Sequence, residues 1–468
     1  MILFPESATY QLEFDKIKVL LGAHCKTEFA KDKAGNLQIH TKKESIELWL
    51  RQTHEYKLLL QNHLDLPGDH IFNISKEMKL LGIQGAVLSG DQLLTLKKLT
   101  ENIRQIFRWF DNERRKAHPA LALIITETYF EKIIIELIDD ILDESGKVKD
   151  NASEKLATVR LGLAKKRNEL RRIFNRIVGR LNKLGYLADI EESFMNGRRV
   201  LAVFAEQKRM VKGILYGESD SRRTAFIERE ETTELNNEIF SLEIEEGREV
   251  HRILQALTLK LSVYAPLLKT YNDILGESDF IRAKARLAID IDGNYATLHD
   301  KAYLNLQKAY HPLLYLYNKP SAKVTVPVNV TLDDTHRILV ISGPNAGGKT
   351  VALKAIGLLQ MMIQSGLLVS CSPESEFGIF KQLMIHIGDT QSLEFELSTY
   401  SSHLKNMKYF MENANGKTLF FIDELGSGSD PDLGGAFAEV IMEELAKKHS
   451  IGIVTTHYLN LKVMANKV

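Results

Sequence analysis

One eight-residue motif constrains the fold of this chain more than any other feature of its sequence. Residues 343–350 read GPNAGGKT and fit the pattern G-x-x-x-x-G-K-[ST], between a short apolar run, 337–341, and a helical pattern, 351–363. A strand, a glycine-rich turn and a helix in that order form a phosphate-binding loop, because the turn and the helix N-terminus aim backbone N–H groups at phosphates. The expected nucleotide-binding residues are Gly343, Pro344, Asn345, Ala346, Gly347, Gly348, Lys349, Thr350 and Val351.

A pair of acidic residues supports the same chemistry. In this type of loop Lys349 would bridge the β- and γ-phosphates and Thr350 would ligate Mg²⁺. The buried strand predicted at 418–422 ends in Asp423 and Glu424, about 73 residues after the loop. Asp423 is predicted to hold the hydrated Mg²⁺, and Glu424 to polarise the attacking water as a general base. Acidic strand ends are common in proteins, but this spacing favours the catalytic interpretation.

A third strand end supplies His457. The run IGIVTTH, 451–457, predicts a strand that ends just before this histidine. His457 could contact the γ-phosphate or the attacking water, although a lone histidine is more often structural.

After Pro320 the sequence changes from a mainly helical pattern to short apolar runs mostly separated by helical stretches. The runs VTVPVNVTL, RILVISG, TLFFIDE and IGIVTTH begin at residues 324, 337, 418 and 451 and are mostly separated by helical stretches. This alternation predicts an α/β unit built on a mainly parallel sheet, with VTVPVNVTL among its strands.

Residues upstream of 320 are mainly helical in pattern. Apolar residues recur at spacings of three and four in 46–61, 93–110 and 153–184, and helix returns at 234–268. Between the last two segments the pattern alternates with period two, so a small β-rich insert is expected at about 186–231. Two long helices with a β unit between them suggest an arm.

The helix predicted at 153–184 carries a basic run. Nine basic residues lie within 160–183, with Glu169 the only acid. Such a run can neutralise nucleic-acid phosphates, although it can equally be a solvated helix face. The candidate contacts on this helix are Lys165, Lys166, Arg167, Arg171, Arg172, Arg176 and Arg180, and two further candidates are Arg222 and Arg223.

Composition excludes several classes of protein. The formal net charge is zero, 44% of the residues are hydrophobic and only two are cysteines, so neither wholesale disorder nor a disulfide scaffold is expected. No apolar run approaches the roughly 18 residues of a membrane helix, and the N-terminus lacks the pattern of a signal peptide. A cytoplasmic protein is expected.

The motifs together resemble a known family. GPNAGGKT, STYSSH at 398–403, DELGSGSDP at 423–431 and TTH at 455–457 are similar to the ABC-type ATPase domain of MutS proteins, and the form DELGSGSDP resembles the MutS-two family. Upstream segments resemble the same family, so the likeness covers essentially the whole chain. These segments are LEFDKIKVLL at 12–21, NGRRVLAVFAEQKRMVKGI at 196–214, ELNNE at 234–238 and FIRAKARLA at 280–288.

The resemblance implies an architecture. It implies a fold of α/β plus all-α class, in which helical core and lever arms carry a small β-rich clamp and precede an ABC-type ATPase domain. The implied domains are the first part of the core and lever, the clamp, the returning helices and a C-terminally incomplete ATPase domain, at 1–185, 186–233, 234–310 and 311–468. The family's mismatch-reading and Smr nuclease domains have no counterpart in this sequence, so mismatch recognition is not expected and any nuclease activity would belong to a missing part.

The resemblance also implies cofactors and partners. ATP and Mg²⁺ are expected, in a homodimer whose subunits pack head to tail. Ser398 and Thr399 would then reach the γ-phosphate held by the partner, and Asp430 would lie at the dimer seam. The alternative for Ser398 is a helix N-cap.

Two substrates remain open from the sequence. One is branched DNA, on which an ATP-dependent clamp would suppress homologous recombination. The other is a stalled or collided ribosome, which the ATPase would split. A non-catalytic, nucleotide-controlled switch is a different class of function, and the Asp423–Glu424 pair argues against it. A transporter ATPase fits poorly, because no membrane span is predicted.

Overall fold

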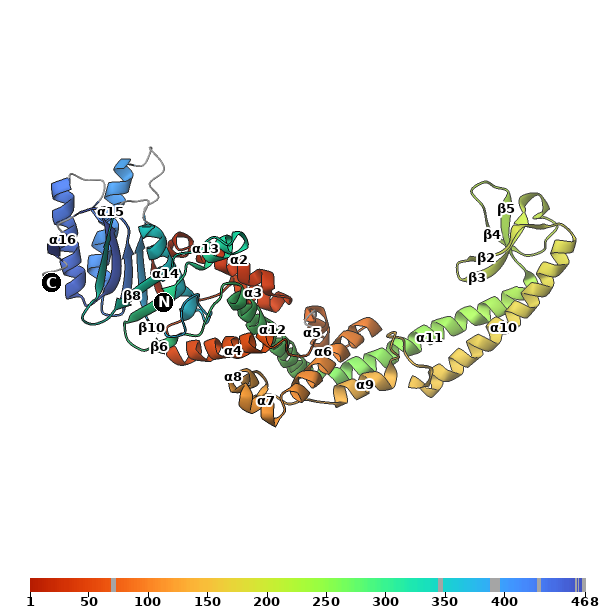
Figure 1. Ribbon diagram of the computed structural model, residues 1–468. Coiled ribbons are helices and arrows are strands. Elements are labelled where there is room, and N and C mark those ends of the chain that lie inside the picture. The colour runs from red at the N-terminus through yellow and green to blue at the C-terminus, as the bar shows by residue number, and fades with distance from the viewer. Residues whose placement is uncertain are drawn as a thin grey trace. The chain divides into compact units, whose positions relative to one another are not determined.

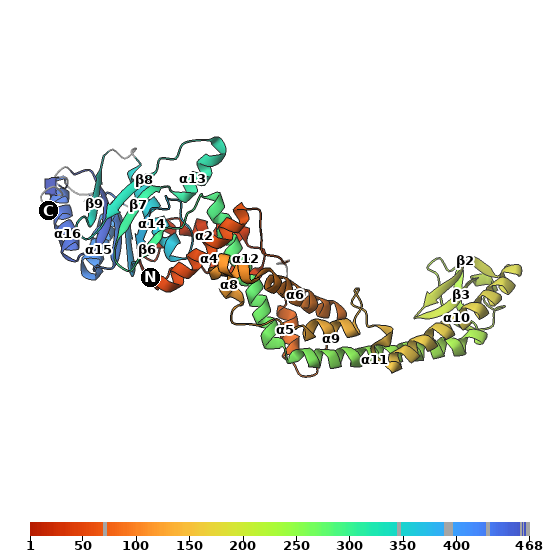
Figure 2. The ribbon, with the colours of Figure 1, turned by 60° about the horizontal axis from the view of Figure 1, so that its bottom comes forward.

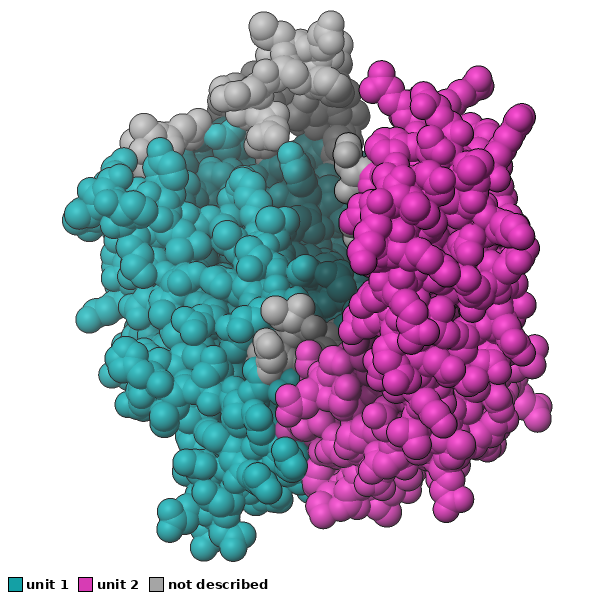
Figure 3. Space-filling model, turned by 90° about the vertical axis from the view of Figure 1, so that its right-hand side faces the viewer, with its two compact units in different colours: residues 1–73, 102–129, 272–468 teal, residues 74–101, 130–271 magenta. Residues whose placement is uncertain are grey.

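The chain folds into two compact units, which Figure 3 distinguishes by colour. Unit 1 comprises residues 1–73, 102–129 and 272–468, and unit 2 comprises residues 74–101 and 130–271. The computed structural model describes residues 1–68, 73–343, 348–387, 396–426, 431–458, 461 and 463–464, apart from the side chains of 189–191, 396–402 and 431–432. Among the described helices, none is long and apolar enough to cross a membrane.

Unit 1 contains a five-stranded sheet in which all neighbouring strands are parallel. The strands lie in the order β1 (Ile2–Phe4), β11 (Gln382–His386), β12 (Thr418–Ile422), β13 (Ile451–Thr456) and β9 (Ile338–Ser342). The parallel arrangement agrees with the prediction from alternating strands and helices. Because parallel strands end at the same edge of a sheet, the residues after β9, β11, β12 and β13 are brought together there.

Helices cover both faces of this sheet (Figures 1 and 2). Alternate strand residues pack in opposite directions, as the two-residue period of a strand requires. Leu419 and Phe421 of β12 pack with α14 (Lys349–Gln364), whereas Phe420 and Ile422 pack with α15 (Glu396–Asn413) and α16 (Pro431–Lys447). The sheet is therefore the middle of three layers, which explains why all five residues of β12 are buried.

The N-terminal strand of the sheet was not predicted. Residues 2–4 pair with residues 382–384 of β11, more than 370 positions later in the chain. Phe4 stacks on Tyr409 of α15 with ring centroids 3.7 Å apart. The first residues of the chain thus complete the sheet that carries the phosphate-loop motif.

A second, four-stranded sheet corrects one expectation. Its order is β6 (Thr297–His299), β10 (Glu376–Gly378), β7 (Leu304–Ala309) and β8 (Val328–Leu332). The run VTVPVNVTL contributes β8, which pairs antiparallel with β7 and not with the parallel sheet. The composition of an apolar run does not specify its pairing partner, so the prediction that this run joins the parallel sheet was wrong.

Helices from both ends of the chain complete unit 1. Leu12, Leu21, Ile46 and Leu50 share one core with Leu358 of α14, so the N-terminal helices pack against the helix that follows the phosphate-loop motif. The remaining helices of this unit are α1 (Ala8–Gln11), α2 (Phe14–His24), α3 (Glu28–Gly35), α4 (Lys43–Gln61), α7 (Asn112–Ala117), α8 (Pro119–Ala122) and α13 (Pro312–Asn318). The boundary between the units falls within α6 (Gly90–Trp109) and α12 (Ala265–Asp290).

A pair of long helices dominates unit 2. The helices α10 (Glu154–Lys183) and α11 (Glu230–Ser262) lie side by side in Figures 1 and 2. Ser153 caps α10 because its Oγ accepts a hydrogen bond from Leu156 N–H at 3.1 Å. The apolar stripe of α10 packs on Leu235 and Ile239 of α11. Two shorter helices of this unit are α5 (Ser75–Leu81) and α9 (Ile133–Ile141).

Four strands form a small antiparallel sheet between α10 and α11 in the chain. Their order is β2 (Leu187–Met195), β3 (Arg198–Phe204), β5 (Thr224–Glu228) and β4 (Ile214–Glu218). Leu201, Val203 and Ile227 share a core with Phe174 and Ile177 of α10, which anchors this four-stranded unit on the helix.

The helix predicted at 234–268 is two helices. The first, α11, ends at Ser262, and α12 begins at Ala265. Proline has no N–H to donate and is tolerated in the first turn of a helix but not in its interior. Pro266 therefore starts a new helix, and a single helix through this position was a wrong prediction.

Candidate functional site

The ends of the phosphate loop have the backbone that glycine favours. Gly343 follows β9 with φ +156°, and Gly348 precedes α14 with φ +79°. The second value lies in the left-handed region, where a side chain would be strained. Pro344, Asn345, Ala346 and Gly347 lie outside the described residues, so their predicted contacts are not placed.

Lys349 links the two described ends of the phosphate loop. Its ammonium group donates a hydrogen bond to the carbonyl oxygen of Gly343, although the side chain is buried. Burying an ammonium group is costly unless oxygen atoms accept its hydrogen bonds. At a turn of this kind, phosphate oxygens can be those acceptors. Val351, two residues after Lys349 in α14, is 42% exposed.

Thr350 and Asp423 come together as the motifs predict. Thr350 Oγ1 donates to Asp423 Oδ2 at 2.7 Å, and Asp423 is 7% exposed at the end of β12. Asp423 N–H also donates to the His386 carbonyl at 2.8 Å. A hydroxyl and a carboxylate are the oxygen donors that Mg²⁺ prefers in proteins, so this pair fits the ion.

Thr455 links the two acids and was not predicted as a site residue. Its side chain is fully buried in β13. Its hydroxyl donates to Asp423 Oδ1 and accepts from Glu424 N–H at 2.8 Å. Glu424 has φ +53°, an unfavourable value for a residue with a side chain, and this hydrogen bond holds it there. The signal in the sequence was a threonine at the end of a buried strand.

His457 faces the second acid of the pair. Its Nε2 lies 3.9 Å from Glu424 Oε1, and its side chain is 46% exposed. The structure therefore brings His457 next to Glu424, and the histidine side chain is partly exposed to solvent.

A buried histidine pair adjoins the acids and was also missed. His386, the last residue of β11, places Nε2 at 2.6 Å from His403 Nδ1, while Asn406 Nδ2 lies 3.1 Å from His386 Nδ1. The amide donates to Nδ1, so His386 carries its proton on Nε2 and donates it to His403. Burial, then the neighbouring His403, lowers the pKa of His386 to about 4 against the opposing effect of Asp423. Burial also lowers the pKa of His403, so both rings are neutral at pH 7.

Three residues of the predicted dimer-related site are not placed. Ser398 and Thr399 belong to α15, but their side chains lie outside the described part of the chain, and so does Asp430. His403, on the same helix, is the described residue that ties α15 to β11.

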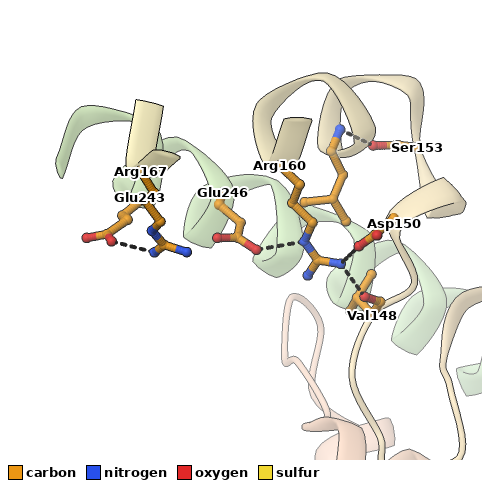
Figure 4. A network of polar contacts seen from close by, with 8 residues as sticks. Val148, Asp150, Ser153, Arg160, Arg167, Glu243 and Glu246 are labelled. Atoms are coloured by element: carbon orange, nitrogen blue, oxygen red, sulfur yellow. Dashed lines mark hydrogen bonds and ion pairs between the residues drawn. The ribbon is translucent and has the colours of Figure 1, made fainter. Parts of the chain in front are cut away.

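Several basic residues of α10 form ion pairs with acids on α11. Figure 4 shows Arg160 between Glu246 and Asp150, and Arg167 paired with Glu243 at 2.6 Å. Lys166 pairs with Glu238 at 2.5 Å, and Arg180 with Glu231 at 3.0 Å. These pairs connect the two helices and weaken the case for Lys166, Arg167 and Arg180 as nucleic-acid contacts.

Other basic residues of α10 point to solvent. Within the described part of the chain, neither an ion pair nor a side-chain hydrogen bond is made by Lys165, Arg171, Arg172, Arg176 or Lys183, and all five are exposed. At 100° per residue, four of them share one face of the helix, opposite its buried stripe. We call this set the outer stripe: Lys165, Arg172, Arg176 and Lys183.

The sheet, the phosphate-loop flanks and the acid pair define a class of protein. Residues 339–468 match the family described as MutS domain V. The region from β9 onward, which contains every described residue of the site, is therefore of the MutS type.

Similarity over the rest of the chain defines the family more closely. The chain is 34% identical over 460 residues to the endonuclease MutS2 of Geobacillus sp. (strain WCH70), a match that covers 96% of this chain and 57% of the relative. It is 32% identical over 458 residues to the endonuclease MutS2 of Aquifex aeolicus (strain VF5), covering 98% and 59%. The chain is thus similar to MutS2 proteins along nearly its whole length, and it spans a little over half the length of these relatives.

Proposed function

We propose that this chain is the ATP-hydrolysing and nucleic-acid-binding part of a MutS-two protein. The observation that carries the proposal is the 2.7 Å contact between Thr350 Oγ1 and Asp423 Oδ2, beside a buried Lys349 and a second acid, Glu424. Residues from two motifs 73 positions apart thereby form one oxygen-rich site at the carboxyl edge of a parallel sheet, where ligands of α/β proteins bind.

The residues have separate roles in the proposed hydrolysis. Lys349 binds the phosphate oxygens, and Thr350 and Asp423 would hold Mg²⁺, which neutralises phosphate charge when bound. Glu424 accepts a proton from the attacking water, and Thr455 fixes the position of Glu424 through its backbone N–H. His457, 3.9 Å from Glu424, would orient the same water.

The proposed active form is a homodimer that completes each site in trans. Ser398 and Thr399 on α15 would contact the nucleotide held by the partner, with Asp430 at the seam. Mixing two inactive variants, Lys349→Ala and Ser398→Ala, tests this arrangement. A mixed dimer contains one site with neither substitution, so ATP hydrolysis should return on mixing. Activity that stays absent, although the mixed dimer forms, would show that Ser398 does not act in trans.

The proposed macromolecular substrate is branched DNA, on which the chain would suppress recombination. The exposed arginines of the outer stripe support binding to a phosphate backbone, which carries no sequence information. The ATP-dependent step would be closure of the dimer on the nucleic acid, and hydrolysis would release it.

One competition experiment separates the candidate substrates. Protein carrying Glu424→Gln is loaded with ATP and offered labelled four-way DNA junctions together with stalled ribosomes. Retention on junctions is the expected result. Retention on ribosomes would replace DNA by the ribosome as substrate. Retention on neither, with ATP bound, would favour a nucleotide-controlled switch that does no work on nucleic acid.

A further inference from the structure

A pocket opens at one end of the four-stranded unit. It is a cavity of about 550 Å³, a size that suits a small ligand. Its lining comes from the turn after α10, the end of β3 and the turn between β4 and β5. The lining residues that matter here are Gly185, Phe204, Glu206, Gln207, Arg222 and Arg223. We call this cavity the tip pocket.

Phe204 is held at the wall of the tip pocket with its ring accessible. Its N–H donates to Tyr186 O at 3.0 Å, and the next N–H, of Ala205, donates to Arg223 O at 2.9 Å. Phe204 is 41% exposed, although Leu201 and Val203 of the same strand are buried. Phe204 is therefore partly open to solvent beside an arginine, and backbone hydrogen bonds fix the chain at this point.

Arg222 occupies a position where glycine would be easier to accommodate. Its φ is +55°, in a turn closed by Ser219 N–H to Thr224 O at 2.8 Å and Arg222 N–H to Ser219 O at 2.7 Å. The left-handed region is strained for a residue with a side chain. Strained residues concentrate at functional sites, and Arg222 lines the pocket.

The two arginines of the pocket are available to an anion. In the described part of the chain, neither Arg222 nor Arg223 forms an ion pair, whereas the acid on the adjoining strand, Glu218, is paired with Lys208. The Lys208 side chain, and to a lesser extent Arg222, lowers the pKa of Glu218, so this acid stays ionised and occupied by the lysine.

Together these groups match the parts of a nucleotide. An aromatic face stacks on a nucleobase, arginines bind phosphate, and carboxylate and amide side chains pair with base edges. Phe204, Arg222 with Arg223, and Glu206 with Gln207 supply these three functions in one cavity. Bases inside a duplex are already stacked, so the pocket can accept only a base that has left the helix. We propose that the tip pocket binds an unpaired nucleotide of a DNA or RNA strand, which rests on the nucleic-acid binding proposed above.

The outer stripe ends close to this pocket along the chain. It ends at Lys183, two residues before Gly185, which lines the pocket after the end of α10. From Lys165 to Lys183 the stripe rises through 18 residue steps, or about 27 Å of helix, long enough to follow several phosphates of a strand. A nucleic acid that contacts both the stripe and the tip pocket would have a paired segment and an unpaired nucleotide, as at the border of a branch.

The test compares three labelled probes by fluorescence anisotropy. These are a DNA duplex, the same duplex with a five-nucleotide single-stranded tail, and that tail with abasic sites in place of its bases. The wild-type chain should bind the tailed probe about tenfold more tightly than the duplex, from the stacking of one or two bases, and the abasic tail should remove this preference. An RNA tail in a parallel titration identifies which sugar is preferred.

Three variants assign the preference to the pocket. Phe204→Ala should bind the duplex normally and lose the preference for the tail. Phe194→Ala is the matched control, because Phe194 is 66% exposed on the same unit but does not line the pocket. Arg222→Gly should lose the preference without lowering the melting temperature, because it relieves the strained backbone.

The outcomes separate this inference from the proposed function. Equal binding of the tailed probe and the duplex by the wild-type chain would overturn the tip-pocket proposal and leave nucleic-acid binding intact. If Phe204→Ala and Phe194→Ala changed the preference for the tail equally, the tip-pocket proposal would also be overturned and nucleic-acid binding left intact. Binding to none of the probes would refute both proposals.

Discussion

The hydroxyl of Thr455 offers the most direct test of how the acid pair is positioned. It makes two hydrogen bonds at once, as donor to Asp423 Oδ1 and as acceptor from Glu424 N–H, and the side chain has no exposure to water. Thr455→Val keeps the shape of the side chain and replaces the hydroxyl by a methyl group. Water cannot easily replace the lost partner, because the position is buried.

The expected magnitude follows from the two groups left unpaired. A buried donor or acceptor without a partner costs about 1–3 kcal/mol, so two of them cost about 2–6 kcal/mol. Asp423 keeps its hydrogen bond from Thr350 at 2.7 Å, which places the expected loss near the lower half of that range. Glu424 also loses the bond that holds its strained backbone. A displacement of about 1 Å at a catalytic group can reduce turnover by about 100-fold, and we expect a loss of that order.

Two assays with a matched variant measure these effects. Thermal unfolding reports stability, and steady-state phosphate release at saturating ATP reports turnover. Thr455→Ser keeps the hydroxyl and loses one methyl group, which costs about 1 kcal/mol. We expect Thr455→Ser to retain most turnover and Thr455→Val to lose it. Equal turnover in the two variants would refute the positioning role of the hydroxyl.

Three further predictions concern the acid pair, the outer stripe and the buried histidines. Glu424→Gln should lower ATP turnover by about 10²-fold or more while ATP binding, measured by equilibrium dialysis, is retained. Arg172→Ala should weaken DNA binding and reduce its salt dependence by about one phosphate contact. Arg167→Ala is the control and should change both quantities less, because Arg167 is paired with Glu243 in the wild type. The pKa of His386 is lowered by burial from 6.5 to about 4, so the unfolded chain takes up this proton first as the pH falls below about 6.5. Stability should therefore drop by about 2 kcal/mol by pH 5, a loss that His386→Asn should reduce in pH-dependent thermal unfolding.

The sequence predicted the parts of the site that depend on local pattern. The strand before the phosphate loop, the helix after it and the strand before Asp423 all lie within two residues of the expected bounds. The pattern of α10 was equally informative, because its helix runs from Glu154 to Lys183 within the predicted 153–184. In each case the residues of a single segment are enough to predict its secondary structure.

Pairings between distant segments could not be predicted in the same way. The basic run of α10 was interpreted without knowing that Glu238 and Glu243 of α11 would neutralise Lys166 and Arg167, since the acids lie more than 70 residues later. The strand at Ile2–Phe4 is three residues long and is defined by its parallel partner, β11, at the far end of the sequence. Composition cannot report such partners.

The residues that were missed at the site lie on strands next to the one that was found. His386 ends β11 and Thr455 lies in β13, the two neighbours of β12, which Asp423 directly follows. Parallel register sets the ends of three strands side by side, so a polar residue at the end of either neighbour must contact the acids or lose its hydrogen bonds in a buried layer. A threonine and a histidine that read as ordinary strand residues become partners of the acids for that reason.

This geometry also limits how the site can change. The His386 carbonyl accepts the Asp423 N–H, and the His386 ring donates to His403 of α15, so one residue contacts both the acid that would hold Mg²⁺ and the helix that carries Ser398. Phe4 stacks on Tyr409 of the same helix and pairs through β1 with β11. A movement of α15 on binding nucleotide would therefore have to break a buried hydrogen bond between neutral imidazoles or carry β11 with it. Because an unpaired buried imidazole is costly, the second response is favoured, and α15 and the edge of the sheet should move as one body.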